Sequence, residues 1–172
     1  EVPLLPYEAC VLGSVNLAAF VQHANGRARI NEEALCQAVR LAVHFLDNVV
    51  EASRYPIPQI ETICRANRKI GVGVMGLADA LIALGIPYGS PASLRVTGHL
   101  MRVVQTAAVE ATRELAATRG AFPNFPFSRF AANGEPPRRN ATVTTVAPTG
   151  SISLIAGCSS GIEPLYALAY ER

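Results

Sequence analysis

The sequence predicts an α/β architecture, because short apolar or β-branched runs alternate with longer stretches of helical periodicity. Residues 141–146 form the clearest strand, a β-branched run bounded by Asn140 and Pro148. Further strands are expected within residues 9–21 and over residues 70–74. Helices separate the three strands, which implies parallel pairing. Three strands make a poor sheet, so we expect the remaining strands to lie outside the chain.

Length and composition limit the classes of protein to which this chain can belong. A chain of 172 residues is one domain or a piece of a larger one, and 50% hydrophobic residues supply a substantial core. A net charge of +2 without a run of lysine or arginine gives no basis for nucleic-acid binding. The apolar runs are too short to span a membrane, and residues 1–20 lack a basic leader. We therefore expect a cytoplasmic protein with no nucleic-acid or membrane partner.

Residues 1–67 contain three predicted helices, of which the first is short. Residues 1–7 are a proline-rich extended segment, and residues 9–21 read as a strand that turns into a short helix. Asn31, followed by two glutamates, predicts the start of a helix that continues to about residue 53. Two prolines then break the chain, and a shorter helix is expected over residues 59–67.

The second half contains the longest predicted helix. A helix over residues 77–84 precedes it. Ser90, followed by a proline, is a cap and first-position pair that begins the long helix, and Gly120 ends it. Residues 122–139 hold four prolines and predict a long irregular connection.

The cysteines do not predict a metal site. They form no Cys-x-x-Cys pair and show no metal-ligand spacing with the three histidines. In a cytoplasmic protein we expect reduced and mostly buried thiols. The cysteines are Cys10, Cys36, Cys64 and Cys158.

Residues 71–76 match the pattern Gly-x-Gly-x-x-Gly, but the context argues against a dinucleotide site. Such a site needs an apolar strand directly before the motif and an acidic residue about 20 positions after it. The preceding residues 65–69 are charged, and no acidic residue occurs between Asp79 and Glu110. We expect these glycines to allow close packing of a helix on a strand.

The turn after the 141–146 strand is a candidate anion site. Gly150 lets the backbone approach a ligand, and the hydroxyls of Thr149 and Ser151 are able to cap a helix that begins there. Free backbone N–H groups at such a turn favour phosphate. Local sequence alone leaves a second interpretation open, an ordinary strand-to-helix turn with a serine cap.

Four stretches carry a resemblance to one family. They read EVPLLPYEACVLGSVN (residues 1–16), RKIGVGVMGLAD (68–79), APTGSIS (147–153) and GCSSGIEP (157–164). In this order they resemble the catalytic subunit of ribonucleotide reductase over essentially the whole chain. The last stretch is most similar to the adenosylcobalamin-dependent branch, class II.

The resemblance implies a fold and an extent. The family's catalytic chain is a ten-stranded α/β barrel with its radical cysteine, in the pattern Asn-x-Cys-x-Glu, on a loop inside the barrel. Residues 1–172 would then be one helix-rich, incomplete segment internal to that barrel. The asparagine and the radical cysteine would stand just before Glu1, so we expect this chain to be inactive alone.

The resemblance also implies roles for individual residues. Glu1 corresponds to the carboxylate that handles the proton of the ribose 3′-hydroxyl. Cys10 corresponds to one of the two cysteines that reduce the substrate and become a disulfide. Cys158 has no implied redox role, and we expect a structural one. The implied substrate-phosphate residues are Pro148, Thr149, Gly150, Ser151 and Ile152.

The implied cofactor is adenosylcobalamin, which generates the radical. The implied partners are a ribonucleotide, as diphosphate or triphosphate, a thioredoxin-type reductant and the missing barrel strands of the same enzyme. Three alternatives remain open from the sequence. They are a module that binds nucleotide phosphate without chemistry, a decayed fragment, and a class I large subunit that receives its radical from a second subunit.

Overall fold

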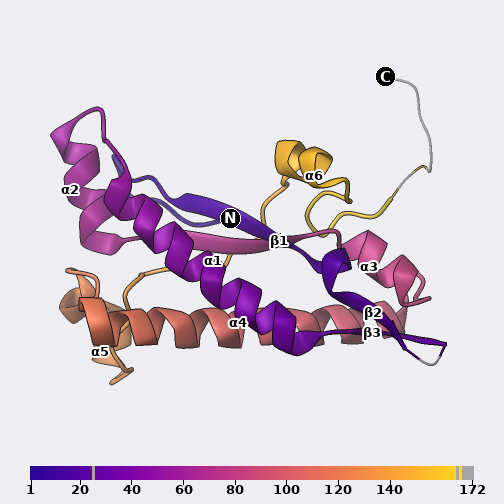
Figure 1. Ribbon diagram of the computed structural model, residues 1–172. Helices are drawn as coiled ribbons and strands as arrows, with labels where there is room; N and C mark the ends of the chain where they lie inside the picture. The colour runs from indigo at the N-terminus through magenta and orange to yellow at the C-terminus, as the bar shows by residue number, and fades with distance from the viewer. Residues whose placement is uncertain (25, 166, 168–172) are drawn as a thin grey trace.

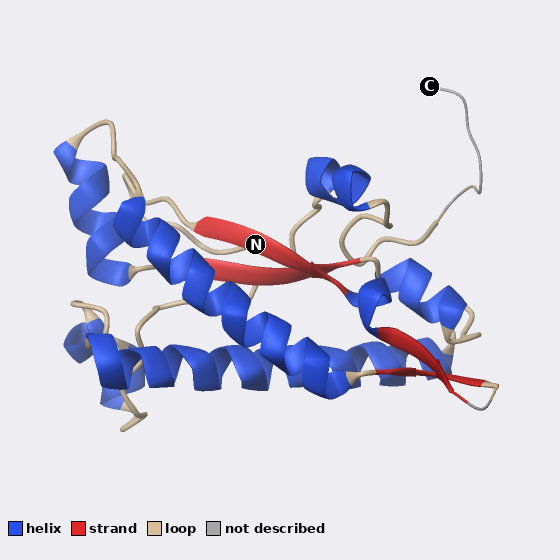
Figure 2. Ribbon diagram, viewed as in Figure 1, coloured by secondary structure: helices blue, strands red, loops and turns tan. Residues whose placement is uncertain are grey.

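The fold combines a parallel strand pair, a hairpin and two long helices (Figure 1; Figure 2). The pair consists of β1 (Val11–Asn16) and β4 (Ile70–Met75), and the hairpin of β2 (Val21–Ala24) and β3 (Arg27–Ile30). Helices and strands are mixed as the α/β prediction requires, although the hairpin was not predicted. The computed structural model describes residues 1–24, 26–165 and 167.

The two longest helices begin where their capping residues predict. The side chain of Asn31 accepts a hydrogen bond from the N–H of Ala34 at 3.1 Å, and that of Ser90 accepts one from Ser93 at 3.1 Å. The helices are α1 (Glu32–Ala52), α2 (Pro58–Asn67), α3 (Leu77–Ala83), α4 (Pro91–Arg119), α5 (Arg129–Ala132) and α6 (Gly150–Ala156), with 3-10 turns η1 (Leu17–Phe20) and η2 (Phe125–Phe127).

The core lies between β1, β4 and the facing sides of α1 and α4. Val39 and Val43 of α1, Val104 of α4, and Ile70 and Val72 of β4 are all fully buried within one cluster. Apolar residues on one stripe of each helix and on a fully buried strand explain this arrangement. Within the described residues, no helix is both long enough and apolar enough to cross a membrane.

The glycines of β4 have a different role from the one predicted. A Cβ atom added to Gly71 or Gly73 would first meet β1 and Thr145, and not a helix. A Cβ atom on Gly71 would lie 2.7 Å from the Leu12 side chain and 2.9 Å from that of Thr145. A Cβ atom on Gly73 would lie 2.9 Å from the Ser14 hydroxyl. The missing side chains therefore let β1 and the segment containing Thr145 approach the two sides of β4.

The strand predicted over residues 141–146 is reduced to one parallel bridge, between Val72 and Thr144. The segment does run beside β4, since the N–H of Val72 donates to the carbonyl of Val143 at 2.8 Å. One step earlier, however, the Thr142 hydroxyl donates to the carbonyl of Ile70 at 3.0 Å. A side chain there occupies the acceptor that a regular ladder would use, so the strand does not extend.

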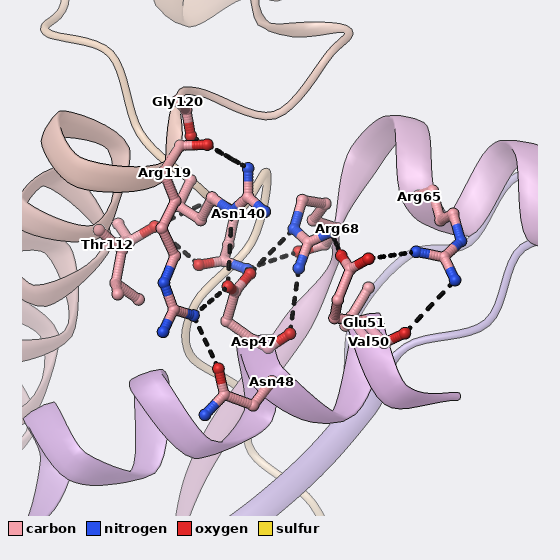
Figure 3. Close-up of polar contacts among 12 residues, drawn as sticks. Asp47, Asn48, Val50, Glu51, Arg65, Arg68, Thr112, Arg119, Gly120 and Asn140 are labelled. Atoms are coloured by element: carbon pink, nitrogen blue, oxygen red, sulfur yellow. Dashed lines mark hydrogen bonds and ion pairs between the residues drawn. The ribbon is translucent and has the colours of Figure 1, made fainter.

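A buried polar network around Asp47 joins α1, α4, the end of α2 and the loop that contains Asn140 (Figure 3). The Asp47 side chain is 1% exposed. The Asp47 carboxylate accepts hydrogen bonds from Arg68 at 2.9 Å and from Asn140 at 3.0 Å. Arg119 and Arg139 lie at 3.3 and 3.4 Å from its second oxygen. Burial alone would raise the pKa of Asp47, but the hydrogen bonds and charge of Arg68, followed by Asn140 and Arg139, hold it below its usual value.

Asn140 is the fixed point from which the following segment leaves this network. It is fully buried, its backbone N–H donates to the Thr112 hydroxyl at 2.9 Å, and that hydroxyl donates to the Asn140 side chain at 2.9 Å. Its side-chain amide also donates to the carbonyl of Arg68 at 3.0 Å. The chain that leads to the predicted phosphate turn is thus anchored at its start.

Candidate functional site

A surface hollow of about 400 Å³ gathers Glu1 and all five residues of the predicted phosphate turn. One wall is the edge of β1 and the other is the turn that leads into α6. A volume of this size suits part of a nucleotide. The residues that line the hollow are Glu1, Leu12, Gly13, Ser14, Ala147, Pro148, Thr149, Gly150, Ser151 and Ile152.

Cys10 is absent from the lining of this hollow but lies close enough to Glu1 for the two to interact electrostatically. The thiol is half-buried, directly before β1. Burial raises the pKa of Cys10, and the carboxylates of Glu1 and Glu8 raise it further, while Lys69 opposes them. The environment of Cys10 therefore favours the protonated thiol, which is the form able to donate a hydrogen.

The predicted phosphate turn is built around Thr149, which adopts the left-handed conformation with φ 54°. Its hydroxyl does not cap α6, contrary to the sequence expectation, and Ser151 supplies no cap either. The Thr149 hydroxyl instead accepts a hydrogen bond from the N–H of Gly161 at 2.7 Å. The capping prediction was wrong because this acceptor is already occupied by a residue that follows α6.

The open end of α6 faces the hollow with unpaired donors. Within the described part of the chain, the N–H groups of Gly150, Ser151 and Ile152 make no hydrogen bond to other protein groups. The first N–H groups of a helix have no intrahelical partner and favour an anion. The geometry is therefore suited to phosphate, although the side chain expected to assist is engaged elsewhere.

The loop of residues 158–161 packs against this turn and holds it in place. Ser159 donates its N–H to the Asp79 carboxylate at 2.6 Å, and its carbonyl accepts from Gly76 at 2.8 Å. Gly161 has φ 48°, and a Cβ atom there would lie 2.7 Å from the carbonyl of Ala147. The loop thus connects the end of β4 to the phosphate turn through close backbone contacts.

Cys158 belongs to this supporting loop. It is half-buried, and a Cβ atom on Gly76 would lie 3.4 Å from its side chain. Burial raises the pKa of Cys158, and the Asp79 carboxylate raises it further. Its place in the loop that packs against Gly76 agrees with a structural role, which stays a prediction.

Sequence reasoning did not single out Asp79 or Gly161, although both lie in stretches that carry the family resemblance. A glycine that must adopt positive φ against a carbonyl is a recognisable signal only once the contact is known. As for metals, no three His, Cys, Asp or Glu side chains in residues 1–24, 26–165 and 167 gather to hold an ion.

The chain belongs to the ribonucleotide reductase barrel domain family, whose model matches residues 1–137 and 134–172. Over its whole length it is 56% identical to a vitamin B12-dependent ribonucleoside-diphosphate reductase of Mycobacterium tuberculosis, covering 24% of that protein. The corresponding reductase of Thermoplasma acidophilum is 46% identical, with 22% of it covered. A ribonucleoside-diphosphate reductase subunit alpha of Chlamydia pneumoniae is 28% identical over 91% of this chain, which covers 18% of that protein.

These matches confirm the resemblance drawn from the four sequence stretches and its preference for the vitamin B12-dependent branch. They also fix the extent of the similarity. The chain spans no more than 24% of the length of these relatives, as an internal segment would.

Proposed function

We propose that this chain is the substrate-reducing segment of a vitamin B12-dependent ribonucleoside-diphosphate reductase. The observation that carries the proposal is the hollow lined by both Glu1 and the turn of residues 148–152. Cys10 lies outside this lining, within electrostatic range of Glu1. The relatives' names supply the reaction and the diphosphate substrate. The turn would hold the phosphates, and the ribose would then lie toward Glu1.

The proposed reaction balances as one ribonucleotide and two thiols giving one deoxyribonucleotide, water and a disulfide. Glu1 takes the proton of the 3′-hydroxyl while the 3′-hydrogen is held by a cysteine outside this chain. Cys10 and a second cysteine outside this chain supply two electrons as the 2′-hydroxyl leaves as water. A thioredoxin-type dithiol then reduces the disulfide by exchange. The raised pKa of Cys10 supports its part, because a protonated thiol is a hydrogen donor.

The proposed cofactor of the intact enzyme is adenosylcobalamin, in keeping with the names of the relatives. When bound, it would supply the radical that a cysteine outside this chain carries to the substrate. The hollow beside Glu1, at about 400 Å³, is by itself too small to hold a corrin. No contact to the cofactor is therefore assigned to this segment.

The proposed setting is a ten-stranded α/β barrel in which residues 1–172 form one incomplete unit. Support comes from the two-stranded parallel pair, which is too small to stand as a sheet. Leu154 and Ile155 on α6 are 66% and 87% exposed, which is unusual for large apolar side chains. The partners that would cover them are the other strands and helices of the same barrel, so we expect no turnover by this chain alone.

Two alternatives are weaker. A class I large subunit is less well supported, because identity to the Chlamydia pneumoniae subunit alpha is 28% against 56% for the vitamin B12-dependent reductase. A module that only binds phosphate would account for the free N–H groups of the turn. It would not account for a carboxylate and a protonated thiol beside them.

The proposal is tested by substituting Glu1 in the intact polypeptide that contains this segment. Glu1→Gln should lower kcat by roughly a hundredfold or more, as loss of a general base does, and leave nucleotide binding within about threefold. Glu33→Gln, an exposed glutamate in the first turn of α1, is the matched control. Turnover that needs no added adenosylcobalamin, or full activity of Glu1→Gln, would refute the assignment.

A further inference from the structure

We propose that Lys69 is a positioning residue for Cys10, acting on the backbone segment that joins Glu1 to Cys10. The inference rests on the proposed function, in which Glu1 and Cys10 act on one substrate. Both residues lie at the ends of a short, irregular segment that enters β1. Such a segment needs external contacts to hold its two ends at a fixed separation.

Lys69 makes two contacts within this segment, one toward each end. Its ammonium group donates to the carbonyl of Pro3 at 2.7 Å and to the carboxylate of Glu8 at 2.7 Å. The Lys69 side chain is 13% exposed and that of Glu8 is fully buried. A charge-assisted pair this well shielded is held more firmly than a surface pair.

Glu8 also forms hydrogen bonds that fix the residues around it. Its first carboxylate oxygen accepts from the Asn67 side chain at 2.7 Å, and its second also accepts from the N–H of Leu5 at 2.8 Å. Asn67 is itself fixed by a hydrogen bond from Asn124 at 2.8 Å. A buried carboxylate with three donors has little freedom to rotate, so the turn formed by residues 5–8 is fixed in shape.

The residues on either side of Cys10 are also fixed by the same stretch of chain. The Cys64 sulfur accepts from the N–H of Ala9 at 3.2 Å and donates to its carbonyl at 3.6 Å. On the far side, the N–H of Val11 donates to the carbonyl of Lys69 at 3.3 Å. Cys10 thus stands between two residues whose backbones are bound to the end of α2 and the start of β4.

The choice of lysine is informative. The sequence contains 15 lysines and arginines together, and Lys69 is the only lysine among them. An ammonium group is compact and donates in three directions, whereas a guanidinium group donates in one plane. A compact donor suits a shielded position between the Pro3 carbonyl and the Glu8 carboxylate.

Lys69 also balances the charge around the thiol. Glu1 and Glu8 raise the pKa of Cys10, and Lys69 is the cation that opposes them. Cys64 is a further titratable group beside this segment, and Tyr7 is one within it. Removing Lys69 would therefore loosen the segment and leave two carboxylates near Cys10 without a counter-charge.

The test uses the intact reductase that contains this segment. Lys69→Met should lower kcat by roughly tenfold to a hundredfold, the effect of a misplaced reacting group, with KM for the ribonucleotide within about twofold. KM should be preserved because the phosphate turn is supported by α3 and residues 158–161. Arg95→Met, which removes an exposed cation from α4, is the matched control and should behave as wild type.

A second measurement separates positioning from general destabilisation. The pH dependence of Cys10 alkylation, followed by mass spectrometry of its peptide, should shift to higher pH in Lys69→Met. In the double variant Lys69→Met/Glu8→Gln, the midpoint should move back toward wild type, because one of the two carboxylates is gone. Loss of folding alone would expose Cys10 and move alkylation to lower pH, which would overturn the proposal.

The outcomes distinguish this inference from the proposed function. If Cys10→Ser keeps full turnover, the proposed function fails. If Cys10→Ser is inactive but Lys69→Met has wild-type kcat and alkylation, the positioning role fails and the function stands. Should Lys69→Met not fold, Cys64→Ala decides, because the side-chain hydrogen bonds that it removes are those to Ala9. A severalfold lower kcat at unchanged KM supports positioning, and wild-type kinetics overturn it.

Discussion

The polar cluster around Asp47 and the phosphate turn lie at opposite ends of the same stretch of chain, residues 140–149, and they are built in opposite ways. In the cluster every major group is paired, and Asp47 alone has four donors within 3.4 Å. In the turn, the described residues leave the N–H groups of residues 150–152 without protein partners.

The difference shows how the segment of residues 140–149 is anchored at one end and is able to bind a ligand at the other. Buried polar groups are costly unless hydrogen bonded, so the cluster is closed and serves only the fold. The turn leaves its donors unpaired at a surface hollow, where a ligand is able to pair them. Between the two ends, the segment lies against β4, where it forms one parallel bridge and several hydrogen bonds to Ile70 and Val72. Substitutions at the two ends should therefore have different consequences.

The largest effect is expected from opening the cluster. Asp47→Ala leaves Arg68 buried without its main partner, and we expect a loss of about 3–5 kcal/mol in the free energy of unfolding. Chemical denaturation measures it. Glu51→Ala is the control, since Glu51 also pairs with Arg68 but its side chain is 60% exposed, and it should cost less than about 1 kcal/mol. Equal losses for the two variants would contradict a closed cluster.

A smaller loss of stability is expected from a substitution in the loop of residues 158–161, which packs against the turn. Gly161→Ala places a Cβ atom 2.7 Å from the Ala147 carbonyl at φ 48°, and should cost about 1–3 kcal/mol. Gly150→Ala is the matched control, because no atom lies within 4 Å of its added Cβ. Thermal unfolding should separate the two variants. Gly150→Ala that melts as low as Gly161→Ala would show that the supporting loop is not under constraint.

The hydroxyl of Thr149 should matter through Gly161. Thr149→Val removes the acceptor of the Gly161 N–H while keeping the side-chain shape, and should cost about 1 kcal/mol of stability. KM for the nucleotide should rise about three- to tenfold as the turn loosens. Thr149→Ser keeps the acceptor and should resemble wild type in both assays. A wild-type KM for Thr149→Val would mean that the turn holds its shape without this bond.

The smallest effect at neutral pH is a change in how stability depends on pH. The pKa of Asp47 is lowered in the fold, so its contribution is present above its unfolded pKa of about 3.9 and is lost as pH falls through the lower folded value. Denaturation in steps from neutral pH into the acid range should show this loss. Asp47→Asn should flatten that slope, and an unchanged slope would contradict the assigned charge.

The sequence predicted features that depend on neighbouring residues. Asn31 and Ser90 mark the helix starts because a cap bonds to an N–H three positions away. The β2–β3 hairpin could have been predicted too, since Asn25-Gly26 separates the two strands in the sequence and is a strong hairpin signal.

Features that depend on distant residues were not predictable. The 141–146 strand failed because the Thr142 hydroxyl bonds to Ile70, and the Thr149 cap failed because Gly161 occupies its oxygen. The cluster around Asp47 draws on residues up to 93 positions apart, which no local pattern reports. The family resemblance implied one site for Glu1 and residues 148–152. These residues line one hollow, while their catalytic and binding roles stay a prediction.

One measurement tests most directly whether Cys10 is a reducing thiol. The intact enzyme is given a ribonucleoside diphosphate and adenosylcobalamin, and deoxyribonucleotide is counted for Cys10→Ser and for Cys36→Ser. Cys36 is a half-buried thiol on α1, outside the hollow. We expect no deoxyribonucleotide from Cys10→Ser and wild-type amounts from Cys36→Ser. Repeated turnover by Cys10→Ser would contradict the assigned role.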